Sequence, residues 1–175
     1  MCLLLKKNAK KQTAKKDIKY YKVLKLETAY RDGEVVYKKF LTPYRKSQVY
    51  LGELNEIETY PNSKPLTTHE FTDDSSETYV KEITGGAFHL FQDKKTAILE
   101  AKDWGYDFSR KVGTLLIKYD TIVVEAIVPA GAHYYKGECE FVISGMKEDE
   151  QPKGICSDKV IYGTEILFSV GEEKK

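Results

Sequence analysis

Hydrophobic and polar residues alternate along several short stretches of the chain, and this two-residue period predicts β-strands. Residues 18–26 and 34–41 both show it, and Asp32-Gly33 between them predicts the turn of a hairpin. Further strands are predicted over residues 114–119, 121–128 and 160–170, the last with a kink at Gly163. Strands therefore dominate the expected secondary structure.

One segment has a helical pattern instead. Asp93 is a good N-cap, the apolar side chains of Ala97, Ile98 and Ala101 fall on one helical face, and Gly105 can end the helix in a left-handed conformation. The sequence thus predicts an α+β fold, a mostly antiparallel sheet with one well-defined helix at about residues 93–104.

The length and the irregular stretches set the expected organisation. A chain of 175 residues suits one domain, which we place at residues 17–175. Residues 53–82 are rich in proline, threonine and acids and have little periodicity, so they are expected to form a long irregular insertion. A second, acidic insertion is expected near residues 138–153.

The formal net charge of +1 conceals a strong asymmetry, because residues 1–25 hold nine lysines and one aspartate, or +8, which leaves −7 for the remainder. We interpret residues 1–16 as a basic N-terminal arm. It is either a solubilising tail or a contact for the phosphates of a nucleic acid. The lysines of this arm are Lys6, Lys7, Lys10, Lys11, Lys15 and Lys16.

Three cysteines at long spacings, with no apolar signal-peptide core at the start, favour a reducing, cytoplasmic compartment. Free thiols are expected, although a Cys139–Cys156 pair is left open. The apolar runs are strand-sized, so no membrane role is implied.

Two histidines and their neighbours are the best candidates for a ligand site. Phe88 and His89 follow a glycine pair, Gly85-Gly86, that would allow a ligand to approach closely. His133, Tyr134, Tyr135 and Lys136 follow a Pro-x-Gly turn and place aromatic faces, hydroxyls and a cation in consecutive positions. For each histidine the competing interpretation is an ordinary strand residue.

Motifs for metals and cofactors are absent from the sequence. There is no Cys-x-x-Cys, His-Glu-x-x-His or His-x-His spacing, and neither a phosphate loop nor a dinucleotide fingerprint occurs. We therefore expect no metal, no cofactor and no dedicated catalytic residue.

Several segments resemble, in the same order, a family of small phage and gut-bacterial proteins with no activity to transfer. The shared segments are the Met-Cys-Leu start, a Tyr-Lys-Val-Leu strand (residues 21–24), a Thr-Pro-Tyr segment (residues 42–44), a Gly-Phe-His-like strand and an Ile-Pro-x-Gly-x-x-Tyr turn. This sequence departs from the family by an inserted Ala87. The resemblance implies a phage or prophage setting.

Three functions fit these observations. The first is an accessory protein that binds, and so sequesters, a small nucleotide-like ligand or a host factor without chemistry. The second is a nucleotide-processing enzyme with an ADP-ribosyltransferase-like sheet, in which His89 holds the nucleotide and Glu125 or Glu165 acts on the ribose. The third is a virion or protein-interaction component that uses the basic arm, with homo-oligomers possible.

Overall fold

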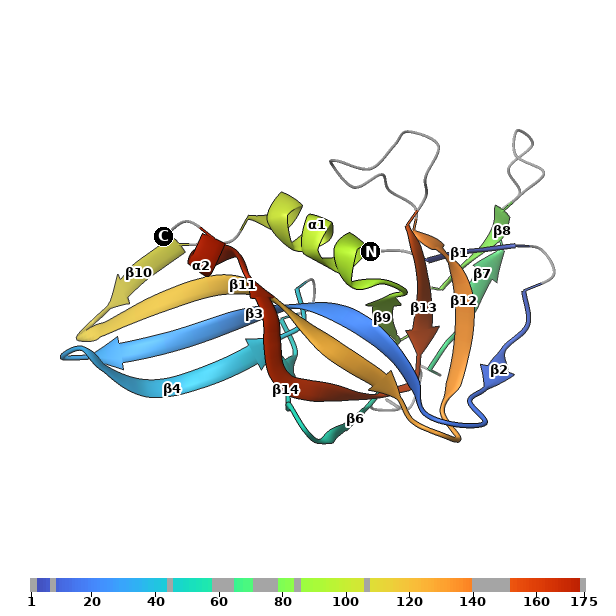
Figure 1. Cartoon of the computed structure of the whole chain (residues 1–175), viewed down its shortest axis with the longest axis horizontal. Coiled ribbons are helices and arrows are strands. Elements are labelled where there is room, and N and C mark those ends of the chain that lie inside the picture. The colour runs from blue at the N-terminus through green and yellow to red at the C-terminus, as the bar shows by residue number, and fades with distance from the viewer. Residues whose placement is uncertain are drawn as a thin grey trace.

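The computed structural model describes residues 3–6, 9–43, 46–57, 65–70, 79–83, 86–105, 108–139 and 152–173. Within them the strands form one 14-stranded sheet in which the paired strands run antiparallel, with two helices (Figure 1). The predicted mostly antiparallel sheet is confirmed, and the fold is largely β. The elements are β1 (Leu3–Lys6), β2 (Gln12–Thr13), β3 (Ile18–Arg31), β4 (Glu34–Leu41), β5 (Gln48–Val49), β6 (Leu54–Glu56), β7 (Thr68–Glu70), β8 (Tyr79–Ile83), β9 (Phe88–Phe91), α1 (Lys94–Trp104), β10 (Phe108–Val112), β11 (Leu115–Val128), β12 (His133–Cys139), β13 (Lys153–Ser157), β14 (Lys159–Ser169) and α2 (Val170–Glu173).

Two 14-residue strands, β3 and β11, form the centre of the sheet. They pair in one unbroken register from Leu116↔Tyr30 to Val128↔Ile18. The predicted hairpin joins β3 to β4, and both Asp32 and Gly33 have the positive φ that its tight turn requires. Opposite Glu125, the missing side chain of Gly163 lets β14 come close to β11, and the register between the two strands shifts next to this position, where the sequence predicted a kink.

Helix α1 is the predicted helix, and it covers one face of the central strands (Figure 1). Asp93 caps it by accepting a hydrogen bond from the Thr96 backbone N–H at 2.8 Å, and Gly105 ends it with φ 53°. Ala97 and Ala101 pack in one apolar cluster with residues of β3, β9 and β11, among them Val23. The small alanines allow the helix axis to lie close to the sheet.

The opposite face of the sheet curls around a larger apolar cluster, the main core, which contains Leu24, Phe88 and Tyr162. Phe88 of β9 and Tyr162 of β14 make an edge-to-face contact with ring centroids 6.2 Å apart, although two strands, β11 and β3, lie between their strands in the sheet order. Tyr134 of β12 belongs to the same cluster. Strands from both sides of β3 can share one core only because the sheet bends around it.

Two expected irregular regions contain strands. Within residues 1–16, Leu3 and Leu5 are fully buried in β1, which pairs with β12 and β8, and β2 also pairs with β12. Two parts of this segment, β1 and β2, therefore belong to the sheet, and the apolar side chains of Leu3 and Leu5 are buried there. Within residues 53–82 the structure describes β6, β7 and most of β8. Most of residues 138–153, together with Lys7 and Cys2, lies outside the described residues.

Neither helix in the described part of the chain has the length and the apolar composition needed to cross a membrane.

Tyr162 is fully buried, and within the described residues its hydroxyl has no hydrogen-bond partner. Burying an unpaired hydroxyl costs about 1–3 kcal/mol. We therefore expect Tyr162→Phe to raise the free energy of unfolding in urea by about that amount. Tyr134→Phe is the matched control, because the Tyr134 hydroxyl donates to Gln12 Oε1 at 2.8 Å in the same core, so its loss should lower stability by about 1 kcal/mol. Equal effects of the two substitutions would contradict this account.

Glu100 of α1 is 4% exposed, and burial raises its pKa from 4.5 to about 7, against a hydrogen bond from Trp104 that lowers it. The folded protein then keeps this proton while the unfolded chain loses it. The free energy of unfolding should therefore fall by about 3 kcal/mol as the pH rises from 4.5 to 7.

We expect Glu100→Gln to remove this fall, so that the variant is more stable than the native protein at pH 8 and similar to it at pH 4. Urea unfolding across that pH range measures the difference. Glu172→Gln, at an exposed carboxylate, is the control and should leave the pH profile unchanged. A pH profile of Glu100→Gln parallel to that of the native protein would show that Glu100 ionises normally.

Candidate functional site

The predicted ligand residues lie on β9 and β12, which flank β13 in the sheet, and they point to two different faces. Cα partners across these strands place His89, Cys156 and Tyr135 in one row, and Phe88, Ser157 and Tyr134 in the next. Because side chains of successive residues point to opposite faces, the two rows look in opposite directions.

Phe88 and Tyr134 lie in the main core, where their side chains are 8% and 6% exposed. Both rings pack against other core residues, and the Tyr134 hydroxyl is engaged by Gln12. In this conformation they hold the curled sheet together and offer no open aromatic face. His133 and Lys136, in contrast, are exposed on β12.

His89 lies beside a thiol that the sequence alone did not place. Its Nδ1 is 3.2 Å from Sγ of Cys156, and its backbone carbonyl accepts a hydrogen bond from the buried Lys22 Nζ at 2.7 Å. An adjacent imidazole can activate a cysteine. Cys156, however, is fully buried in the apolar cluster that also contains Ala97 and Ala101 of α1, so its thiol is shielded from solvent.

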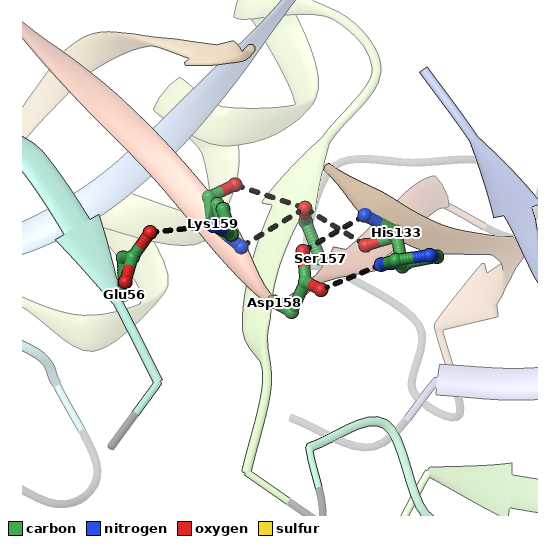
Figure 2. Close-up of polar contacts among 5 residues, drawn as sticks. All are labelled: Glu56, His133, Ser157, Asp158 and Lys159. Carbon is green, nitrogen blue, oxygen red and sulfur yellow. Dashed lines mark hydrogen bonds and ion pairs between the residues drawn. The ribbon is translucent and has the colours of Figure 1, made fainter. Parts of the chain in front are cut away.

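His133 is held by Asp158 at the corner where β13 passes into β14 (Figure 2). The His133 backbone N–H donates to Asp158 Oδ1 at 2.8 Å, and its ring Nδ1 lies 3.1 Å from Oδ2. The carboxylate therefore fixes both the backbone and the ring of His133, whose side chain is 49% exposed. Nearby, Lys159 forms an ion pair with Glu56 at 2.6 Å.

Ser157, His133 and Asp158 are the residue types of a serine hydrolase triad, but their arrangement differs from one (Figure 2). The Ser157 hydroxyl donates to the carbonyl oxygens of His133 at 3.1 Å and Lys159 at 2.9 Å. A triad needs the hydroxyl to donate to the imidazole. The serine therefore closes the strand corner and is not positioned as a nucleophile.

Glu125, the acid of the enzymatic alternative, forms an ion pair with Lys19. It shares a face with Tyr21 and Phe91, its successive neighbours across β3 and β9. Among the described residues Lys19 is the charged partner of Glu125. Strand β3 lies between β11, which carries Glu125, and β9, which carries His89. Glu165 is exposed on β14.

Of the predicted basic arm, the side chains of Lys10, Lys11, Lys15 and Lys16 are exposed. They flank β2 and the buried Ala14. The Ala14 backbone N–H donates to the Ala132 carbonyl, and the Ala14 carbonyl accepts a hydrogen bond from the Gly131 N–H. Lys6 is in β1, with its side chain outside the described residues. In the described part of the chain no group of three or more His, Cys, Asp and Glu side chains could hold a metal ion.

A second candidate surface lies at the other end of the sheet, where β4, β3, β11 and β10 extend side by side beyond α1 (Figure 1). Cα partners run in a straight row from Lys39 through Glu27 and Tyr119 to Phe108. We call this surface the aromatic face and define it by the residues Lys25, Glu27, Tyr37, Lys39, Phe108, Arg110 and Tyr119. The sequence analysis did not identify it.

Two stacked rings and two cations form the centre of the aromatic face. Phe108 and Tyr119 stack with centroids 4.6 Å apart and an interplanar angle of 25°. Lys25 Nζ lies 4.9 Å from the Tyr119 centroid and 5.6 Å from that of Phe108, and the Arg110 guanidinium lies 5.4 Å from that of Tyr119. Phe108 is 45% exposed, so its ring remains accessible beside both cations.

Charges at the aromatic face are unbalanced. Burial lowers the pKa of Lys25, and the positive charges of Lys46 and Arg110 lower it further, against the opposing effect of Glu27. Glu27 is the single carboxylate among the residues that define the face. It accepts a hydrogen bond from the Tyr37 hydroxyl at 2.8 Å, and this hydrogen bond raises the pKa of Tyr37. The defined face thus carries three cations against one acid, and an added anion would relieve the repulsion.

One sequence signal could have identified β10, the strand that carries Phe108 and Arg110. Phe108, Arg110 and Val112 alternate with Ser109 and Lys111, which is a strand pattern that ends at the turn residue Gly113. The pairing of Phe108 with Tyr119 could not be read from the sequence, because it depends on the register between β10 and β11.

Comparisons of the chain with protein-family models, curated proteins and solved structures find no match.

Asp158 should stabilise the strand corner more than its neighbouring ion pair does. We expect Asp158→Ala to lower the free energy of unfolding by about 1–2 kcal/mol, because hydrogen bonds to a charged group are lost from the His133 backbone and ring. Lys159→Ala, which removes a surface ion pair, should cost less than about 1 kcal/mol. Urea unfolding of both variants provides the comparison, and a smaller loss for Asp158→Ala would refute this role.

Proposed function

We propose that the protein binds a nucleotide-like ligand through the aromatic face and leaves the ligand chemically unchanged. The base stacks on the exposed ring of Phe108, and Lys25 and Arg110 bind the phosphate. This proposal keeps the function expected from the sequence and moves its centre from the two histidines to β10 and β11.

The observation that carries the proposal is the stacked Phe108–Tyr119 pair with a cation on either side. Base stacking on an aromatic side chain contributes about 1–3 kcal/mol per base and tolerates any base. Phosphates form charge-assisted hydrogen bonds with cations, and Lys25 and Arg110 lie 4.9 and 5.4 Å from the Tyr119 ring centroid, beside the stacked pair. Tyr119, buried beneath the outer ring, keeps Phe108 in place.

Binding without chemistry is supported by the engagement of the polar groups that could react. Ser157 bonds to backbone carbonyls, Glu125 pairs with Lys19, and Cys156 is buried. The resemblance to phage and gut-bacterial proteins supports a phage-related setting for this proposed accessory protein. The predicted residues His89, His133, Tyr135 and Lys136 lie away from the aromatic face, on β9 and β12, and the same experiment can measure their role.

Native mass spectrometry of the purified protein tests this proposal directly. We expect incubation with a mixture of nucleoside mono-, di- and triphosphates and cyclic dinucleotides to yield a complex from which the ligand is recovered with its mass unchanged. Phe108→Leu keeps an apolar side chain but removes the stacking surface, so it should weaken binding by roughly fivefold or more.

Two controls separate the possible sites. Val112→Ala changes an equally exposed residue of the same strand and should leave binding unchanged. His133→Ala should also leave it unchanged if the aromatic face is the site. A chemically altered ligand would point to the enzymatic alternative, and binding that survives Phe108→Leu but not His133→Ala would move the site to β12.

A further inference from the structure

We infer that the natural ligand of the aromatic face is a single-stranded nucleic acid that crosses the four strands from β10 to β4. This inference rests on the proposed function and specifies its substrate class. It follows from a second aromatic–cation pair on the same face of the sheet, on β4, three strands away from Phe108.

The second pair consists of Tyr37 and Lys39. Lys39 Nζ lies 4.8 Å from the centroid of the Tyr37 ring, and the Tyr37 hydroxyl is fixed by Glu27. Lys39 is exposed, and Tyr37 is half-buried. β4 therefore presents the same combination of ring and cation that β10 and β11 present around Phe108.

The spacing between the two pairs decides the kind of ligand. Lys39 and Phe108 are the two ends of one row of Cα partners, three strand spacings apart, or about 14 Å. One base can stack on Phe108 or reach the Tyr37–Lys39 pair. A ligand that places a base at both pairs must contain at least two linked nucleotides.

The charges along the row suit such a chain. Lys25 and Arg110 lie at the Phe108 end, and Lys39 lies at the other end, so cations are spread along the path of the phosphates. Glu27, in the middle of the row, is engaged by the Tyr37 hydroxyl. Flat sheet faces with exposed rings and flanking cations suit single strands, since a duplex keeps its bases stacked inside.

The face carries no dense set of base-reading side chains. Aromatic stacking and phosphate contacts discriminate weakly between bases, so affinity should depend on strand length and salt more than on sequence. Three phosphate contacts predict a slope of about −2 in a plot of log affinity against log salt concentration, because each contact to a single strand contributes about −0.7.

The test is a length series of fluorescein-labelled oligothymidylates of two, four and eight nucleotides, followed by fluorescence anisotropy with the full chain. We expect affinity to rise from dimer to octamer and to exceed that of thymidine monophosphate, measured by competition. Phe108→Leu should weaken octamer binding roughly 5- to 150-fold. Val112→Ala should leave octamer binding unchanged.

Lys39→Gln separates this inference from the proposed function. It should reduce the salt slope of the octamer by about 0.7 and weaken octamer binding, while monophosphate binding changes less than twofold. If monophosphate binds through Phe108 but the octamer binds no better, the proposed function stands and the nucleic-acid inference is wrong. If neither binds, both are wrong.

Two further polyanionic probes with eight repeating units test whether charge alone explains binding. An abasic octamer lacks bases to stack, and an octaglutamate peptide represents an acidic protein partner. Both should bind at least fivefold more weakly than the oligothymidylate octamer. Equal binding of either one, insensitive to Phe108→Leu, would overturn the inference in favour of a general polyanion or acidic-protein surface.

Discussion

The structure depends on the register between β3 and β11. These two long strands pair without interruption over their shared length, so one register assigns every side chain of both strands to a face. A slip by one residue would move Val23 and Val123 away from α1 and Leu24 and Ile122 out of the main core. The same slip would turn Tyr119 to the opposite face. Core and candidate binding surface are therefore fixed by one set of hydrogen bonds.

One face of these strands serves two purposes along its length. Near the middle, Val23 and Val123 pack beneath the alanines of α1. Further along the same alternation, beyond the helix, Lys25, Glu27 and Tyr119 form part of the aromatic face. There Ala29 and Ile117 are still buried, covered in part by Tyr37 and Leu115 of the same sheet. The long side chains of that region can thus shield a small apolar cluster and remain available to a ligand.

Local signals in the sequence predicted the hairpin at Asp32-Gly33, the Asp93-capped helix and the kink at Gly163, because each depends on a few neighbouring residues. The lysines of residues 1–16 suggested an arm, but the burial of Leu3 and Leu5 could not be foreseen, since only distant strands provide it. The candidate site was beyond prediction for the same reason. Consecutive residues such as His133 and Tyr134 looked like one cluster, but alternation separates them, whereas Phe108 meets Tyr119 only through pairing.

The central claim is that the face built by β10, β11, β3 and β4 binds nucleotide chains. The most direct measurement is a map of backbone amide chemical shifts by NMR during titration of the native protein with an oligothymidylate octamer. The account predicts the largest changes at Phe108, Arg110, Tyr119 and Lys25, extending to Lys39 on β4 and sparing β9 and β12. Changes centred on His89, His133 and Tyr135, or no changes at saturating octamer, would contradict it.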